Sequence, residues 1–160
     1  MDSREAIKGS LDMADLVCTS YLNDLSDSDL MQRPHPECNH VNWQVGHLIV
    51  AENQMMEGIA PGKMPALPAG MAEKYTKDTA ASDDAGQFAS KDELLAAHKA
   101  QRAATLEVLA GLSDEDMDKE TGVDYAPTVG AMVRMQAEHW MMHCGQWVIV
   151  RRATGKPVVI

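Results

Sequence analysis

The sequence predicts an all-α protein that folds as a four-helix bundle, and three observations support this fold class. The chain has 12 methionines and 1 phenylalanine, and 45% of its residues are hydrophobic. Runs of β-branched residues alternating with polar ones, which are typical of strands, are nearly absent. The apolar residues recur instead at intervals of three and four, within segments rich in good helix formers. A length of 160 residues suits one hydrophobic core, so we expect a single domain over residues 1–160.

The first two expected helices are amphipathic. One spans residues 4–25, and the other spans residues 39–58 with Asn39 as its N-cap. The second helix contains Gly46 beside His47. A glycine inside a helix costs about 1 kcal/mol relative to alanine, so we expect a packing or access reason for it. The core-facing positions expected in the first helix are Leu11, Ala14, Val17 or Cys18, Tyr21 and Leu25.

A long connection follows the second helix. Residues 59–90 contain three prolines and many small polar residues, with one short helical turn expected at 71–75. Loops of this length are uncommon in compact domains and usually cover or line something, the alternative being a disordered insertion. A long connection also allows the second and third helices to run parallel.

The second half of the sequence repeats features of the first. Ser90 and Glu93 form a capping-box pattern that opens a third helix over residues 91–111. The sequence LSDEDM follows this helix, much as LSDSDL follows the first. A fourth helix opens around Pro127-Thr128 and continues to about residue 153. We therefore expect two related helix–turn–helix halves joined by the long connection.

Three histidines form the most informative pattern in the sequence. His139 and His143 are four residues apart in the fourth helix, so both lie on one helix face. They could share a metal ion or simply stack along the helix. His47 in the second helix supplies a third ligand, and three histidines with open positions are typical of catalytic metal sites. Imidazole suits several divalent metals, so the ligands do not select one. Candidates to hydrogen-bond the ligands from outside are Gln44, Glu52, Glu138 and Gln146.

Several other metal sites are excluded. A ferritin-like di-iron bundle requires Glu-x-x-His pairs, but Met55 lies three residues after Glu52 and Met141 lies three residues after Glu138. A metallopeptidase helix requires HExxH, and Trp140 occupies the position of its glutamate. The cysteine-and-histidine motif of zinc deaminases is also absent.

Charge and composition limit the partners. The formal net charge of −10 repels nucleic acid and anionic membrane surfaces, so we expect neither as a partner. No segment approaches the roughly 18–20 apolar residues of a membrane-spanning helix. The polar N-terminal segment lacks the pattern of a secretory signal. Cys18, Cys38 and Cys144 form no metal-binding or disulfide pattern, so we expect reduced thiols and a cytoplasmic location.

The histidine segments resemble signatures of the DinB/YfiT-like superfamily. Residues 43–48 with Glu52 are similar to its W-x-x-G-H-L-x-x-x-E segment, and residues 139–146 are similar to its H-x-x-x-H-x-G-Q segment. The sequence GMAEKY at 70–75 and the ending GKPVV resemble one branch of the same superfamily. The resemblance extends over nearly the whole chain.

This resemblance implies a four-helix bundle of up-down-down-up order that binds one metal ion. The metal is commonly nickel or zinc, with iron or manganese as further candidates, and its ligands correspond to His47, His139 and His143. Some relatives are metal-dependent thiol transferases that join bacillithiol, mycothiol or glutathione to electrophiles, and others are thiol-dependent isomerases. We therefore expect a thiol-transferase-like enzyme that uses a small-molecule thiol and an electrophilic substrate. The alternative is a non-catalytic metal-binding or stress-associated scaffold, and either could form a homodimer.

The remaining polar residues carry weaker expectations. We expect His98 to be a core or rim residue, and His35 and His40 to be solvated or near the mouth of the site. Cys144 stands where an arginine often follows the second histidine in relatives. Its side chain points about 100° away from His143 around the helix, so we expect a buried small hydrophobe and not a nucleophile.

Overall fold

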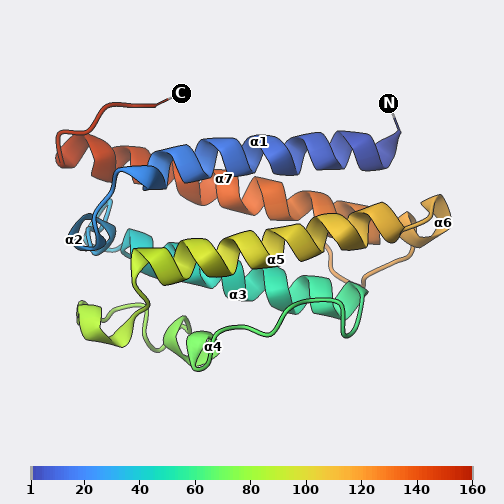
Figure 1. The fold of residues 1–160 in the computed structure, drawn as a ribbon, viewed down its shortest axis with the longest axis horizontal. Helices are drawn as coiled ribbons and strands as arrows, with labels where there is room; N and C mark the ends of the chain where they lie inside the picture. Colours follow the sequence, from blue (N-terminus) through green and yellow to red (C-terminus); the bar gives the residue numbers. More distant parts are fainter. Residues whose placement is uncertain (1, 160) are drawn as a thin grey trace.

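The computed structural model describes residues 2–159, which are mostly helical and include no strand, so the prediction of an all-α protein is confirmed. The four long helices lie side by side (Figure 1). An isolated bridge pairs Glu120 with Thr128 before the last helix. The long helices are α1 (Ser3–Asn23), α3 (Val41–Ile59), α5 (Lys91–Gly111) and α7 (Val129–Ala153). The short ones are α2 (Asp27–Leu30), α4 (Met71–Lys74), the 3-10 helix η1 (Ala85–Gln87) and α6 (Asp114–Met117).

The packing of the long helices places α3 beside α7. α1 packs most extensively against α7, and α3 packs against both α5 and α7. In Figure 1, α3 and α5 begin at the end of the molecule where α1 and α7 end. No helix in residues 2–159 is both long enough and apolar enough to cross a bilayer.

The two halves of the chain have the same order of elements. In each half a long helix is followed by a four-residue helix and a second long helix: α1, α2 and α3, then α5, α6 and α7. Ser26 and Asp29 form a capping box that opens α2, and Ser113 and Asp116 form the matching box of α6. The two similar sequence motifs therefore form the same local structure.

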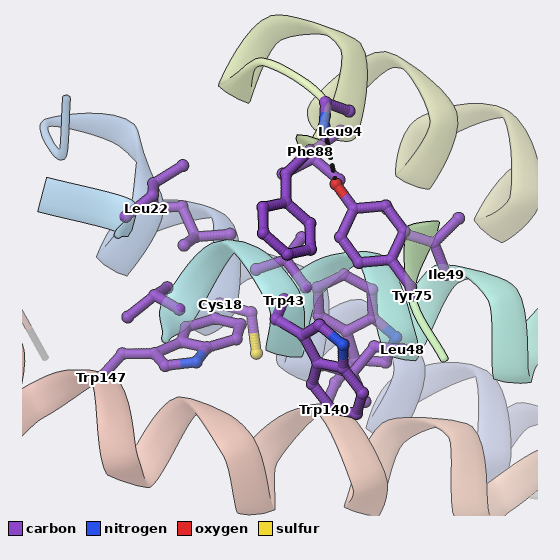
Figure 2. Packing of buried hydrophobic residues seen from close by; sticks show 14 of the residues in the cluster. Cys18, Leu22, Trp43, Leu48, Ile49, Tyr75, Phe88, Leu94, Trp140 and Trp147 are labelled. Carbon is purple, nitrogen blue, oxygen red and sulfur yellow. Dashed lines mark hydrogen bonds between the residues drawn. The ribbon is translucent and has the colours of Figure 1, made fainter. Parts of the chain in front are cut away.

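The long connection is packed against α3. Figure 2 shows Tyr75 and Phe88 of the connection beside Trp43 and Ile49 of α3. The hydroxyl of Tyr75 donates to Asn42 Oδ1 at 3.0 Å and accepts from the backbone N–H of Ala89 at 3.0 Å. The disordered alternative is therefore wrong.

Close packing against the connection explains the glycine in α3. A Cβ atom at Gly46 would lie 2.2 Å from the nearest ring carbon of Tyr75. Because real side chains do not tolerate that separation, only glycine allows the ring to lie this close to α3. The expected packing reason for Gly46 is the aromatic ring of Tyr75.

A buried ion pair joins all four long helices. Arg102 of α5 donates from Nε and Nη2 to the two carboxylate oxygens of Glu52 in α3, both at 2.9 Å. Trp140 Nε1 of α7 donates to the same carboxylate at 3.1 Å, as does Thr105 Oγ1 at 2.7 Å. Arg102 Nη1 also donates to Asp15 Oδ1 of α1 at 2.8 Å. Good geometry and extra hydrogen bonds are what a buried ion pair requires, and this one has both.

The structure corrects the expectations for His40 and Asn39. The N-cap of α3 is His40 and not Asn39: His40 Nδ1 accepts from the backbone N–H of Trp43 at 2.9 Å. His40 is fully buried, with the ring of Phe88 packed edge-on at 4.7 Å between centroids, so the expectation of a solvated residue was wrong. His35 is exposed.

His98 lies in the core, as expected. Its Nε2 is 3.3 Å from Asp15 Oδ1, and its ring lies 4.1 Å from that of Trp140 between centroids. Burial of the Nδ1 atom leaves that nitrogen without a hydrogen-bond partner.

Candidate metal centre

Three histidines from two helices form a compact cluster. His47 of α3 and His139 and His143 of α7 each offer a ring nitrogen, and these atoms lie within 4.8 Å of one another. The ring centroids are 5.4 Å apart for His47 and His139, 5.9 Å for His47 and His143, and 5.1 Å for His139 and His143. Between residues 2 and 159, this is the only group of three or more His, Cys, Asp or Glu side chains so arranged.

Hydrogen bonds set the tautomer of His143. Its Nδ1 atom lies 3.0 Å from Gln44 Oε1, which also accepts from Trp147 Nε1 at 3.0 Å. An indole N–H can only donate, so the Gln44 atom shared by both rings must be the amide oxygen. His143 Nδ1 therefore carries the proton and donates it. Its Nε2 keeps a free lone pair, the form in which a histidine binds a metal.

The amide nitrogen of Gln44 is fixed as well. Gln44 Nε2 donates to the backbone carbonyl of Asn39 at 2.7 Å and to Gln146 Oε1 at 3.1 Å. With both ends of the amide bonded, Gln44 holds His143 in one orientation.

An aromatic side chain orients His47. The indole of Trp43 stacks on the His47 ring with 5.0 Å between centroids and 9° between planes. Trp43 Nε1 donates to the carbonyl of Thr76 and to Thr79 Oγ1, both at 3.2 Å. The connection therefore fixes the indole that lies against this ligand candidate.

The environment favours neutral imidazoles. Burial lowers the pKa of His47 and His139, and in His139 the charge of His47 adds to the effect. Burial, with the charges of His139 and His47, lowers the pKa of His143 to about 4. Three neutral rings with converging nitrogens fit a divalent cation, because metal binding requires unprotonated imidazole.

The cluster lies between two cavities. His47 and His143 line one of about 700 Å³, together with Trp43 and Tyr75. Its other lining residues are Asn39, Val50, Ala51, Gln54, Ala72, Thr76, Lys77 and Ala80. His139 lines a second cavity of about 440 Å³ on α7. A ligand could therefore reach the cluster from either cavity.

The four outer candidates from the sequence have different surroundings. Gln44 contacts His143, and Gln146 contacts Gln44. The hydrogen bonds of Glu52 go to the buried pair with Arg102 and its neighbours, not to a histidine. Glu138 is exposed and forms an ion pair with Arg134 at 3.0 Å.

Three further residues near the cluster were not predicted from the sequence, whereas the burial of Cys144 was. Trp147, Thr76 and Thr79 were not identified, because the first contacts the cluster through Gln44 and the others lie in the connection. Cys144 is buried, as expected for a thiol in the core.

Comparisons with known proteins give a family and a fold. The family model of the DinB superfamily matches residues 17–147. A crystal structure described as the conserved protein of locus from Enterococcus faecalis superposes with a TM-score of 0.76. It is 19% identical and the match covers 98% of this chain and 99% of that chain, so it shows the shared fold alone. No curated protein sequence matches.

Proposed function

The chain belongs to the DinB superfamily, and on this basis we propose that it is a metal-dependent enzyme with His47, His139 and His143 as ligands. The observation that carries the proposal is the His143 tautomer, because Gln44 and Trp147 leave its Nε2 free to bind. Three imidazole ligands with further positions open are the pattern of catalytic metal sites. Nickel and zinc are the proposed metals, with iron and manganese as alternatives.

We propose a thiol-transferase-like reaction. The thiol sulfur bonds to an electrophilic carbon, the thiol proton passes to water, and the leaving group departs with its bonding electrons. A bound divalent metal would lower the pKa of a coordinated thiol and supply thiolate at neutral pH. Asn39, Gln54 and Thr76 offer hydrogen bonds in the larger cavity, and Lys77 offers a positive charge for a carboxylate of the thiol.

Metal analysis tests the ligand set. After expression with added nickel and zinc, we expect about one metal ion per chain, as for a three-histidine site. His143→Gln should lose it, whereas His35→Gln, which changes an exposed histidine outside the cluster, should retain it. A wild-type protein without metal would overturn the proposal.

A conjugation assay tests the reaction. It combines the metal-loaded protein with bacillithiol, mycothiol or glutathione and with 1-chloro-2,4-dinitrobenzene. We expect the wild type to accelerate at least one conjugation and His143→Gln to abolish the acceleration. A metal-loaded protein inactive with every thiol would favour the non-catalytic scaffold.

We also propose one domain folded as a four-helix bundle of up-down-down-up order. The shared direction of α1 with α7, and of α3 with α5, supports this order (Figure 1). A homodimer is proposed because Met13 and Leu16 of α1 and Ile149 of α7 are exposed, at 55%, 57% and 51%. Light scattering after size-exclusion chromatography would test it, and a monomer at micromolar concentration would contradict it.

A further inference from the structure

The smaller cavity beside the histidine cluster has an apolar lining rich in methionine. Met135, His139 and Met142 lie on one face of α7, because they are four and three residues apart. Met55 of α3, Tyr125 of the segment before α7 and Glu138 of α7 complete the lining. This set of residues is called the methionine pocket below.

The exposure of these side chains calls for an explanation. Met142 is 60% exposed and Tyr125 is 70% exposed, although both are large and apolar. Exposed apolar groups that gather around a hollow mark ligand sites more often than singly scattered ones do. Flexible thioethers adapt to varied shapes and contact aromatic rings favourably. The lining therefore suits a small aromatic molecule.

The charges around the methionine pocket indicate which class of ligand it can bind. Glu138 is the one carboxylate of the methionine pocket, and its ion pair with Arg134 is mostly exposed to solvent. The lining contains no lysine or arginine, and the formal net charge of the chain is −10. In the metal-free protein, in which binding is tested below, an anionic ligand would meet no cation in this lining and would be repelled. A neutral ligand would not be repelled, so the lining favours an uncharged molecule.

The larger cavity has more polar residues in its lining than the methionine pocket has. Its lining includes Asn39, Gln54, Thr76 and Lys77, residues whose side chains can form hydrogen bonds or carry a positive charge. Polar and charged thiols suit those groups. Because His47 and His143 line the larger cavity while His139 lines the methionine pocket, the cluster lies between two cavities, and only the larger of them has a lysine in its lining.

We infer that the methionine pocket binds the neutral aromatic part of the second substrate, next to His139. This inference rests on the proposed function, and it names the class of electrophile: an uncharged aromatic compound. The thiol then occupies the larger cavity, whose lining includes Lys77 and more polar residues. With a volume of about 440 Å³, the methionine pocket is in the size range of small-molecule sites.

The test uses the protein labelled with ¹³C at the methionine methyl groups. Methyl 4-nitrobenzoate is the neutral probe, and 4-nitrobenzoate is its anionic counterpart. The ring currents of the neutral probe should shift the methyl signals of Met55, Met135 and Met142. The signal of Met31, the C-cap residue of α2 outside the pocket, should stay in place. The anion should bind at least about fivefold more weakly.

Matched variants locate the binding site. Met142→Gln keeps the length of the side chain but removes apolar contact, and should weaken binding of the neutral probe about fivefold. Val158→Gln, a change in the C-terminal tail outside the pocket, should leave the affinity unchanged. Both residues are exposed, so both variants should fold as the wild type does. Equal effects of the two substitutions, or shifts absent from the pocket methionines, would overturn the inference.

The outcomes separate this inference from the proposed function. Probe binding is measured without metal, whereas the ligand set is tested by metal content. A protein that binds metal but shows no pocket shifts overturns the methionine pocket alone. A protein that shows pocket shifts but binds no metal retains the aromatic site and loses the proposed enzyme.

Discussion

Replacing Gln44 by leucine should weaken metal binding without removing a ligand. The Gln44 amide oxygen orients His143 through a hydrogen bond of 3.0 Å and fixes the proton on Nδ1. Loss of such an orienting partner typically lowers metal affinity about 10- to 100-fold, or about 1.4–2.8 kcal/mol. The same change leaves the buried Trp147 Nε1–H without its acceptor, which should lower the free energy of unfolding by about 1–3 kcal/mol.

Two variants separate orientation from stability. Gln101→Leu removes another buried glutamine, one that donates to Pro65 and accepts from Asn53 and has no hydrogen bond to the three clustered histidines. It should cost similar stability and leave metal affinity unchanged. Gln44→Glu keeps an acceptor for both rings, so its metal affinity should be close to that of the wild type.

The assay is competition for zinc with a chromogenic chelator, paired with urea unfolding of the metal-free proteins. The expected order of affinity is wild type and Gln101→Leu first, Gln44→Glu next and Gln44→Leu last. If Gln44→Leu is destabilised yet binds zinc as tightly as the wild type, the tautomer argument is refuted.

Three further predictions concern the fold. Glu52→Ala removes the bidentate partner of the buried Arg102 guanidinium and leaves only the partly exposed Asp15, so the free energy of unfolding in urea should fall by up to about 3–5 kcal/mol; a loss below about 1 kcal/mol would contradict this role. Gly46→Ala places a Cβ against the Tyr75 ring and should cost about 1–3 kcal/mol, whereas the same substitution in a Tyr75→Ala background should cost much less. Burial lowers the pKa of His40 to about 4, while an unfolded histidine has a pKa near 6.5. Between these values the unfolded chain binds more protons, so the free energy of unfolding should fall as the pH decreases from about 6.5 to about 4. His40→Asn retains a capping acceptor and should flatten this decline, and an equally steep decline in both proteins would speak against His40.

The three clustered histidines could be predicted from the sequence, but the residues that hold them in place could not. Helical periodicity puts His139 and His143 on one face, and the position of His47 in the second helix, supported by the family signature, adds the third ligand. Among the four outer candidates, only the structure separates Gln44 from Glu52. The partner of Glu52 is Arg102, fifty residues away, and no local pattern predicts so distant a pair.

The N-cap of α3 shows a second limit of prediction from the sequence. Asn39 is a better cap by general preference, but the adjacent His40 performs the role. His40 is covered by the ring of Phe88, which lies near the end of the connection. The sequence predicts that such a long connection covers something, although it does not specify which side chains are covered.

The packing of Tyr75 against Gly46 has an evolutionary consequence. Five residues that line the larger cavity, all between positions 72 and 80, belong to the connection, which contributes none of the clustered histidines. Substitutions there can change the shape and charge of the cavity while α3 and α7 keep the cluster intact. Selection can therefore change which molecules the cavity binds without altering the proposed metal ligands. The condition is that an aromatic ring still packs against Gly46.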